Sequence, residues 1–227
     1  MFLKLFSKEK EHQYYDYPGV LKIHDLSLMK TYAPWFLEGV KSGKIKVNNA
    51  VVGIVNNNFY WYSGTWKCGI WETGIWDKGI WLSGDWETGV WNNGVWNNGT
   101  WKIGKWNYGE WKNGTWYDGV WKTGFWYNGT WDNGKWNGGR WYNGKWKNGE
   151  WFSGIWCNGE WFSGTWYSGT HEKGYWYDGT WKMGTWKMGE WFAGNWWDGE
   201  WDNGVWKHGV WNGGTWKNGI WKGGIKK

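Results

Sequence analysis

A five-residue period dominates residues 61–225 of this chain. In each repeat a glycine stands two positions before a large residue, as Gly64 stands before Trp66. Tryptophan fills 32 of the 33 large positions from residue 61 to residue 221, and His171 fills the remaining one. Such a strict period constrains the path of the backbone much more tightly than it constrains a chemical function.

Neither an α-helix nor a straight strand explains a period of five. A helix would scatter residues spaced by five around its surface, and a strand would alternate them between two faces. A chain that turns a corner every five residues points each tryptophan inward instead. The residue before the tryptophan is β-branched in more than half of the repeats, which favours an outward strand position. The second residue after it is Asn, Asp or Gly in 16 of 33, which predicts a corner with positive φ at that position.

This frame resembles that of pentapeptide-repeat proteins, whose repeat has a small residue, an outward residue, a large apolar residue and two corner positions. Here glycine takes the place of the small residue and tryptophan that of the large one, over residues 61–225. The resemblance implies an all-β fold: a right-handed, four-sided parallel β-helix (a solenoid) with about 20 residues per coil. The hand also follows from the preference for right-handed parallel crossovers. Four faces would stack the indoles in four columns, with each indole N–H donating to a corner carbonyl.

Residues 1–60 depart from the repeat and predict a separate capping segment. Residues 25–30 and 34–39 are typical of short helices, with Asp25 as a cap and Pro34 in a first turn. Residues 43–60 keep a weak five-residue spacing. We therefore expect three parts: an N-terminal segment with short helices that caps or attaches the rod (1–42), a degenerate capping coil (43–60), and the Trp/Gly solenoid (61–227).

Charge and composition exclude several classes of function. The net charge is +6, and residues 61–227 contribute +3 through 18 basic and 15 acidic residues, so the surface is mixed rather than polybasic or acidic. The resemblance would otherwise suggest a DNA mimic that binds topoisomerases, but that needs a strongly acidic surface. Nucleic acid is therefore not a favoured partner. We expect no catalytic residues, metal or cofactor, because no catalytic, metal-binding or phosphate-binding motif is present.

The remaining compositional signals concern location. The apolar run at residues 1–6 is interrupted by Lys4, so no secretion signal is expected, and no stretch is long enough to span a membrane. Cys68 and Cys157 have no metal-like spacing, which favours a reducing environment. A four-sided coil would place these two cysteines on different corners, too far apart for a disulfide. We expect an intracellular protein, or a virion component if the chain is phage-encoded.

Aromatic residues directly after the tryptophan predict a candidate binding surface. With four repeats per coil, Tyr117, Tyr177 and Trp197 would share one corner, and Tyr127 and Tyr167 another. They would either bind a protein or a glycan or only shield the backbone at the corners. The candidate surface comprises Tyr117, Tyr127, Tyr142, Tyr167, Tyr177 and Trp197.

Apolar outward residues near both ends of the repeat predict self-association. An open parallel edge flanked by apolar residues can pair with another chain, although the terminal lysines also protect such an edge. The candidate oligomer contacts are Ile70, Ile75, Ile80, Val205, Val210, Ile220 and Ile225.

His171 has two readings: a ligand or pH switch, and drift of the repeat to a smaller residue. The sequence favours drift, because no second ligand has metal-like spacing.

These observations favour a non-enzymatic structural or docking rod in a larger assembly such as a phage virion, since Trp/Gly pentads look like tracts in phage-encoded proteins. The alternative is a glycan- or protein-binding module that uses the corner aromatics. We expect a protein partner, reached by self-association or within an assembly, with a glycan as the alternative ligand.

Overall fold

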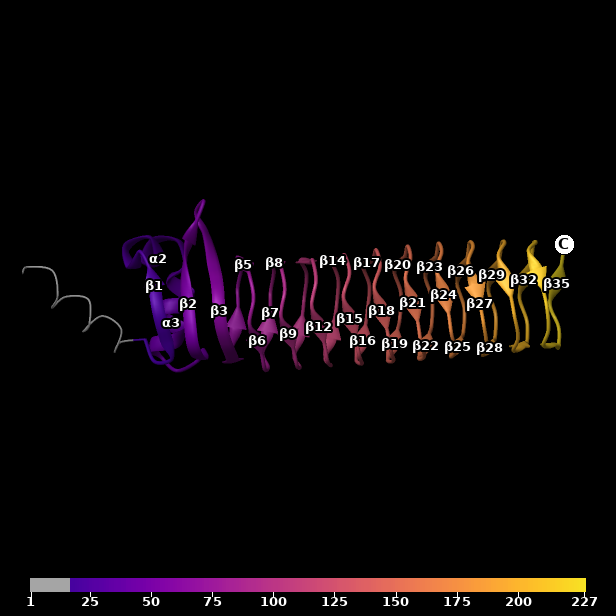
Figure 1. Cartoon of the computed structure of the whole chain (residues 1–227), viewed down its shortest axis with the longest axis horizontal. Helices are drawn as coiled ribbons and strands as arrows, with labels where there is room; N and C mark the ends of the chain where they lie inside the picture. The colour runs from indigo at the N-terminus through magenta and orange to yellow at the C-terminus, as the bar shows by residue number, and fades with distance from the viewer. Residues whose placement is uncertain (1–16) are drawn as a thin grey trace, which may run out of the picture.

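A computed structural model describes residues 17–227 as a helical cap followed by a long parallel β-solenoid (Figure 1). The apolar run at residues 1–6 lies outside the described residues. The solenoid has about eleven turns of about 15 residues each, because every short strand pairs in parallel with the third strand after it. Thr100 pairs with Thr115, for example, and Trp101 with Trp116. At roughly 4.8 Å per coil the solenoid is roughly 50 Å long.

Three repeats close one coil, so the solenoid has three faces and not the expected four. Each short strand consists of the outward residue and the large residue after it. The first face contains the start of β3 (Asn58–Cys68) and β5 (Ile75–Trp76), β8 (Val90–Trp91), β11 (Lys105–Trp106), β14 (Val120–Trp121), β17 (Lys135–Trp136), β20 (Glu150–Trp151), β23 (Thr165–Trp166), β26 (Thr180–Trp181), β29 (Asn195–Trp196), β32 (Val210–Trp211) and β35 (Ile225–Lys226).

The second face contains the end of β3 and β6 (Ile80–Trp81), β9 (Val95–Trp96), β12 (Glu110–Trp111), β15 (Phe125–Trp126), β18 (Arg140–Trp141), β21 (Ile155–Trp156), β24 (Thr170–His171), β27 (Thr185–Trp186), β30 (Glu200–Trp201) and β33 (Thr215–Trp216). The third face contains β4 (Ile70–Trp71), β7 (Asp85–Trp86), β10 (Thr100–Trp101), β13 (Thr115–Trp116), β16 (Thr130–Trp131), β19 (Lys145–Trp146), β22 (Glu160–Trp161), β25 (Tyr175–Trp176), β28 (Glu190–Trp191), β31 (Val205–Trp206) and β34 (Ile220–Trp221).

Glycine makes the sharper three-sided turn possible. Gly124 has a φ of +126°, and a Cβ built on it would lie 2.5 Å from the carbonyl oxygen of Gly109 one coil earlier. Only glycine tolerates both this φ and this approach. The positive φ therefore falls on the glycine, and the expectation that the Asn-like corner position adopts it is wrong. Turning by a third of a circle at each corner, rather than by a quarter, closes the coil after three repeats.

The inward tryptophans form the core, as expected, in three columns rather than four. Each face contributes one column, and these indoles are fully or almost fully buried as far as Trp211, while Trp216 and Trp221 are half-buried. Within a column successive indoles stack at 4.6–5.1 Å with interplanar angles of 4–7°. Indoles of neighbouring columns meet edge to face at 5.5–6.1 Å. Both arrangements are favourable for aromatic rings.

Backbone hydrogen bonds tie each coil to the one before it. The amide of Thr100 donates to the Gly84 carbonyl at 2.9 Å, and the amide of Lys102 donates to the Trp86 carbonyl at 2.8 Å. The expected indole bonds to corner carbonyls are formed by Trp76 and Trp196, at 3.2 and 3.1 Å. Most of the other buried indole Nε1 atoms of the columns have no hydrogen-bond partner among the described residues.

Two short helices cover the start of the solenoid, as the sequence predicts. α2 (Leu26–Tyr32) begins after Asp25, whose carboxylate accepts a hydrogen bond from the Leu28 amide at 3.0 Å. α3 (Pro34–Lys41) begins at its proline. The buried ring of Phe36 contacts Trp61 and Trp66, and Phe59 contacts Trp71 at 4.9 Å, so an aromatic ring of the cap ends each column.

Residues 43–60 do not form the expected degenerate coil. β2 (Lys46–Val55) and β3 make an antiparallel hairpin, and β1 (Val20–His24) adds to it in parallel. Asn56 and Asn57 supply the turn with φ of 49° and 62°, as a tight hairpin requires. The hairpin still occupies the place of a coil, because a Cβ on Gly64 would lie 2.7 Å from the Asn49 carbonyl oxygen.

Candidate interaction surface

The corner aromatics form stacked ladders that run along the rod. The first corner follows the first face, the second corner the second face, and the third corner the third face. Phe152 stacks on Tyr167 at the first corner, at 4.8 Å and 2°. Tyr127 stacks on Tyr142 at the second corner, at 4.9 Å and 9°. At the third corner Phe162, Tyr177 and Phe192 stack in sequence, at 5.0 and 4.9 Å.

Lysines cover the ends of these ladders. The ammonium of Lys112 lies 3.9 Å from the ring centroid of Tyr127, and that of Lys207 lies 3.9 Å from the centroid of Phe192. At the first corner the Lys182 ammonium lies 4.9 Å from the ring of Trp197. Each lysine precedes or follows its ring by three repeats, so it occupies the adjacent coil. Cation–π contacts of this kind stabilise a partly exposed site by about 0.5–1 kcal/mol.

The three-sided coil changes which candidate residues lie together. Tyr117 and Tyr177 do share the third corner, but four coils separate them. Trp197 lies at the first corner with Tyr167, and Tyr127 shares the second corner with Tyr142 instead of with Tyr167. The grouping expected from a four-sided coil is therefore wrong, although all six residues lie at corners.

Most of these rings have little free face. Tyr117, Tyr167 and Trp197 are exposed, and Tyr127, Tyr142 and Tyr177 are half-buried. In each stacked pair the neighbouring ring covers one face, so the outer edge of the ring is what meets solvent. Trp197 is the most open of the six, with 51% of its surface exposed. A sugar ring that stacks on an aromatic side chain needs an exposed ring, so Trp197, which has the largest exposed fraction of the six, is the best placed to bind one although Lys182 lies over one of its faces.

Polar and charged residues continue the same ladders. Ion pairs join Glu87 to Lys102 and Asp132 to Lys147, each at 2.8 Å and each between adjacent coils. Such exposed pairs contribute little to stability individually. They also neutralise one another along the corner, so the rod has an ordered surface of mixed charge.

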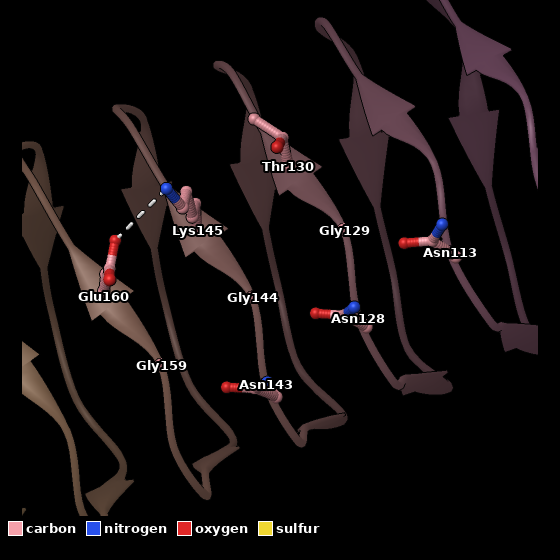
Figure 2. Close-up of a pocket in the computed structure, with 9 residues that line it drawn as sticks. All are labelled: Asn113, Asn128, Gly129, Thr130, Asn143, Gly144, Lys145, Gly159 and Glu160. Atoms are coloured by element: carbon pink, nitrogen blue, oxygen red, sulfur yellow. Dashed lines mark ion pairs between the residues drawn. The ribbon is translucent and has the colours of Figure 1, made fainter.

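A shallow groove of about 350 Å³ lies beside the second corner (Figure 2). Asn113, Asn128 and Asn143 project from successive coils in one row along it. Lys145 and Glu160, paired at 3.7 Å, line its other side. Reasoning from the sequence missed these residues. Asparagine recurs at every third repeat, at positions 98, 113, 128, 143 and 158, and this recurrence is the signal that could have found them.

Corner Asn and Asp side chains have a structural role here. The carboxylate of Asp118 accepts a hydrogen bond from the Gly119 amide at 2.7 Å, and Asp178 and Asp198 do the same for the glycines that follow them. Asn203 and Asn218 use their amide oxygens in the same way, at 2.8 Å. Part of the preference for Asn and Asp at this position therefore reflects a bond to the next glycine, and part reflects pairing between coils, as Asn113 donates to Asn98 at 3.3 Å.

His171 is buried within the second column and has no ligand-like surroundings. Its ring stacks on Trp186 at 3.8 Å and lies 6.1 Å from Trp156. Both ring nitrogens lack a hydrogen-bond partner in the described part of the chain, and burial lowers the pKa of the imidazole to about 3. Among residues 17–227 no group of three or more His, Cys, Asp or Glu side chains is placed to hold a metal ion.

The candidate oligomer contacts lie on all three faces. Ile70, Val205 and Ile220 are on the third face, Ile75, Val210 and Ile225 on the first, and Ile80 on the second. Ile70, Ile80, Ile220 and Ile225 are exposed, and the other three are half-buried. They form no continuous apolar stripe along one face.

Two further findings concern the cysteines and the search for a membrane-spanning helix. Both cysteines are free. Cys157 follows Cys68 after about six coils, and the two lie on the same corner rather than on different ones. No helix within the described part of the chain is long and apolar enough to cross a bilayer.

Comparison of the chain with protein-family models, with curated proteins and with solved structures found no match. The molecule is thus defined by its fold, a parallel β-solenoid with a tryptophan about every five residues. Its likeness to pentapeptide-repeat proteins is limited to the spacing of the repeat, since the four-sided coil of the resemblance is replaced by a three-sided one.

Proposed function

We propose that this protein is a non-enzymatic rod that docks other molecules on its surface as part of a larger assembly, such as a virion. The filled interior is the observation that carries the proposal. Three columns of rings, all of them indoles except His171, fill the core, so any partner must bind outside it. Backbone bonds between all coils and ordered corners support a stiff rod.

The test is to follow the tagged protein in its native source. Particles are separated on a density gradient and washed with high salt, and the protein is then located by immunogold electron microscopy. A rod of this function stays with the particles at a fixed ratio of copies. If all of the protein instead sediments as a free monomer, the proposal is wrong.

The partner is proposed to be a protein, either another component of the assembly or a second copy of the chain. Contact between copies would use the apolar outward residues, among them Ile70 and Ile80 at one end and Ile220 and Ile225 at the other. Light scattering of the purified protein measures its mass directly. A mass that returns to that of one chain after Ile220→Lys and Ile225→Lys would support self-association, and an unchanged monomer mass before substitution would exclude it.

A second candidate function, glycan binding, is favoured by the open ring of Trp197. A glycan array gives the first test. Trp197→Ala is then compared with Tyr127→Ala, a matched control in which the ring is covered by Lys112 and Tyr142. Binding lost only in the first variant supports a glycan site at this corner, and an array without signal removes this function.

A further inference from the structure

The indole columns form one continuous network of touching aromatic rings. Along the first column the ring centroids of Trp91, Trp106 and Trp121 are 4.8 and 4.7 Å apart, and the rings are nearly parallel. Neighbouring columns are joined by edge-to-face contacts, as between Trp106 and Trp111 at 6.0 Å. Because indole is the most easily oxidised of the uncharged aromatic side chains, and stacking spreads a positive charge over adjacent rings, this network suits the movement of an electron vacancy.

The surroundings of the indoles favour such movement. An oxidised indole normally loses its N–H proton, which traps the vacancy on one ring. Here the Nε1 atoms of Trp91, Trp106 and Trp121 are buried and have no hydrogen-bond acceptor among residues 17–227. The indole radical cation therefore keeps its proton and can still accept an electron from the next ring.

His171 interrupts the second column, because imidazole is harder to oxidise than indole. The electron vacancy can bypass His171 through the indoles of the third column. Trp156 contacts Trp161 at 5.8 Å, and Trp161 stacks on Trp176 at 4.6 Å. The edge-to-face contacts thus keep the network connected past this coil.

The network reaches the surface at the cap. Trp35 is half-buried and contacts Trp71 at 5.7 Å. It also lines an open cavity of about 370 Å³, together with Ile45, Ile70 and Glu72. A small oxidant or reductant can therefore approach an indole that is in ring contact with the columns.

We propose that the columns carry one-electron oxidation along the rod between its coils and Trp35, an activity that goes beyond the docking function and does not depend on it. In each step one electron passes from a neutral indole to a neighbouring indole radical cation, so no bond forms or breaks and no proton moves. The oxidant is a one-electron acceptor stronger than the indole radical cation, such as a photo-oxidised metal complex. An external thiol or ascorbate supplies the electron that refills the vacancy.

A photo-oxidant attached to one coil tests this activity. Cys68→Ser leaves Cys157, next to Trp156, as the single site for a ruthenium polypyridyl label, which light and a cobalt(III) acceptor convert to Ru(III). Trp35 lies about six coils away, or roughly 30 Å. Two one-electron oxidations and one water convert a tryptophan to hydroxytryptophan and release two protons. Tryptic peptide 31–41 reports this product at Trp35 by mass spectrometry.

Trp197 provides an internal comparison, since it is exposed, nearer to the label and set on a corner outside the columns. With the attached label we expect severalfold more product at Trp35 than at Trp197. With the same complex free in solution we expect the reverse, because exposure then decides the product. If Trp197 is preferred in both cases, the oxidation travels through solvent and the proposal is wrong.

Two triple variants separate transport from damage to the fold. Trp101→Phe, Trp106→Phe and Trp111→Phe remove one indole from each column between the label and Trp35, and should reduce the product at Trp35 severalfold. Trp181→Phe, Trp186→Phe and Trp191→Phe are the matched set on the far side of the label from Trp35. They should leave the amount of product at Trp35 unchanged. Equal effects of the two sets would overturn the proposal. Transient absorption of the unsubstituted protein gives a further check, since we expect the spectrum of the protonated radical cation and not that of the neutral radical.

Discussion

At the scale of single residues, the repeat glycines set the geometry of the coil. Their φ angles lie between +96° and +143°, and each glycine approaches the preceding coil so closely that a Cβ has no room. The tryptophan supplies apolar surface, but the glycine lets coils approach closely enough for indoles to stack. The two residues of the motif are therefore coupled, since neither produces this core without the other.

Gly124→Ala should destabilise the solenoid strongly. The new methyl group would meet the Gly109 carbonyl oxygen at 2.5 Å in a backbone conformation that alanine avoids, so we expect a loss of about 3 kcal/mol or more. Gly138→Ala is the matched control, because its nearest neighbour would be the Ser153 hydroxyl at 3.5 Å and its φ is not in the positive region. Urea unfolding should show a change of less than about 0.5 kcal/mol for that variant. Similar losses in both would contradict this account.

Asp118→Ala should remove the side-chain acceptor for the Gly119 amide. The expected loss is about 1 kcal/mol of the free energy of unfolding, as for a typical intramolecular hydrogen bond. Asp118→Asn keeps an oxygen in the same place and should retain most of the stability, as Asn203 does in its own corner. Thermal unfolding of the three proteins tests the role of the corner oxygen. An alanine variant as stable as the parent would rule it out.

At the scale of the coil, the sequence predicted the direction of each residue but not the number of repeats per turn. Inward tryptophans, outward β-branched residues and parallel coils all follow from the five-residue period. A period of five is compatible with three or four repeats per turn, and the choice depends on how sharply the backbone bends at glycine. The recurrence of asparagine at every third repeat from position 98 to 158 does carry that information, because corner residues of adjacent coils touch.

The corner ladders could be predicted only in part for the same reason. The sequence identifies Tyr127, Tyr142 and Trp197 as corner residues, but stacking partners follow from the length of the coil. The hairpin of the cap was missed because its weak five-residue spacing imitates a coil. The turn at Asn56 and Asn57 was the local signal against that interpretation.

Replacing His171 tests the column directly. The imidazole leaves a wider interval toward Trp156 than an indole would, so His171→Trp should stabilise the protein by about 1–3 kcal/mol. The same substitution restores an unbroken second column. Thermal unfolding at neutral pH measures the effect. A less stable variant would show that the neighbouring rings have closed the space.

His171 should also make stability depend on pH. Its folded pKa of about 3 lies below the unfolded value of 6.5, so the unfolded chain binds more protons and stability falls as pH decreases from 6.5 toward 3. Relative to His171→Phe, which cannot titrate, the parent should lose about 3 kcal/mol between about pH 7 and about pH 4. Urea unfolding at both pH values gives the difference. Parallel losses in the two proteins would show that the histidine is not the cause.

At the scale of the whole molecule, the rod is a stack of nearly equivalent layers on a distinct cap. Each coil contacts the coils directly before and after it, so stability should vary with the number of coils in a regular way. Deletion of residues 114–128 removes one complete coil and joins Asn113 to Gly129, which preserves the repeat. We expect a folded protein shortened by about 5 Å, measured by small-angle X-ray scattering.

Deletion of residues 114–130 is the matched control, because its length is not a multiple of five and it therefore breaks the phase of the repeat. It should place corner residues such as Asn133 at inward positions and tryptophans such as Trp131 at glycine positions, and so prevent the following coils from forming. Circular dichroism distinguishes the two outcomes. Equal loss of structure after both deletions would show that the coils are not interchangeable layers.

The order of cap and coils along the chain also affects how the protein is made. The cap precedes the solenoid, and its Phe36 and Phe59 present the aromatic surface on which the first indoles rest. The cap can therefore fold before the solenoid is synthesised, and each new coil of three repeats can then pack on the coil formed before it. We therefore expect the solenoid to grow from the cap toward the C-terminus, so that few tryptophan-rich segments remain unfolded at one time.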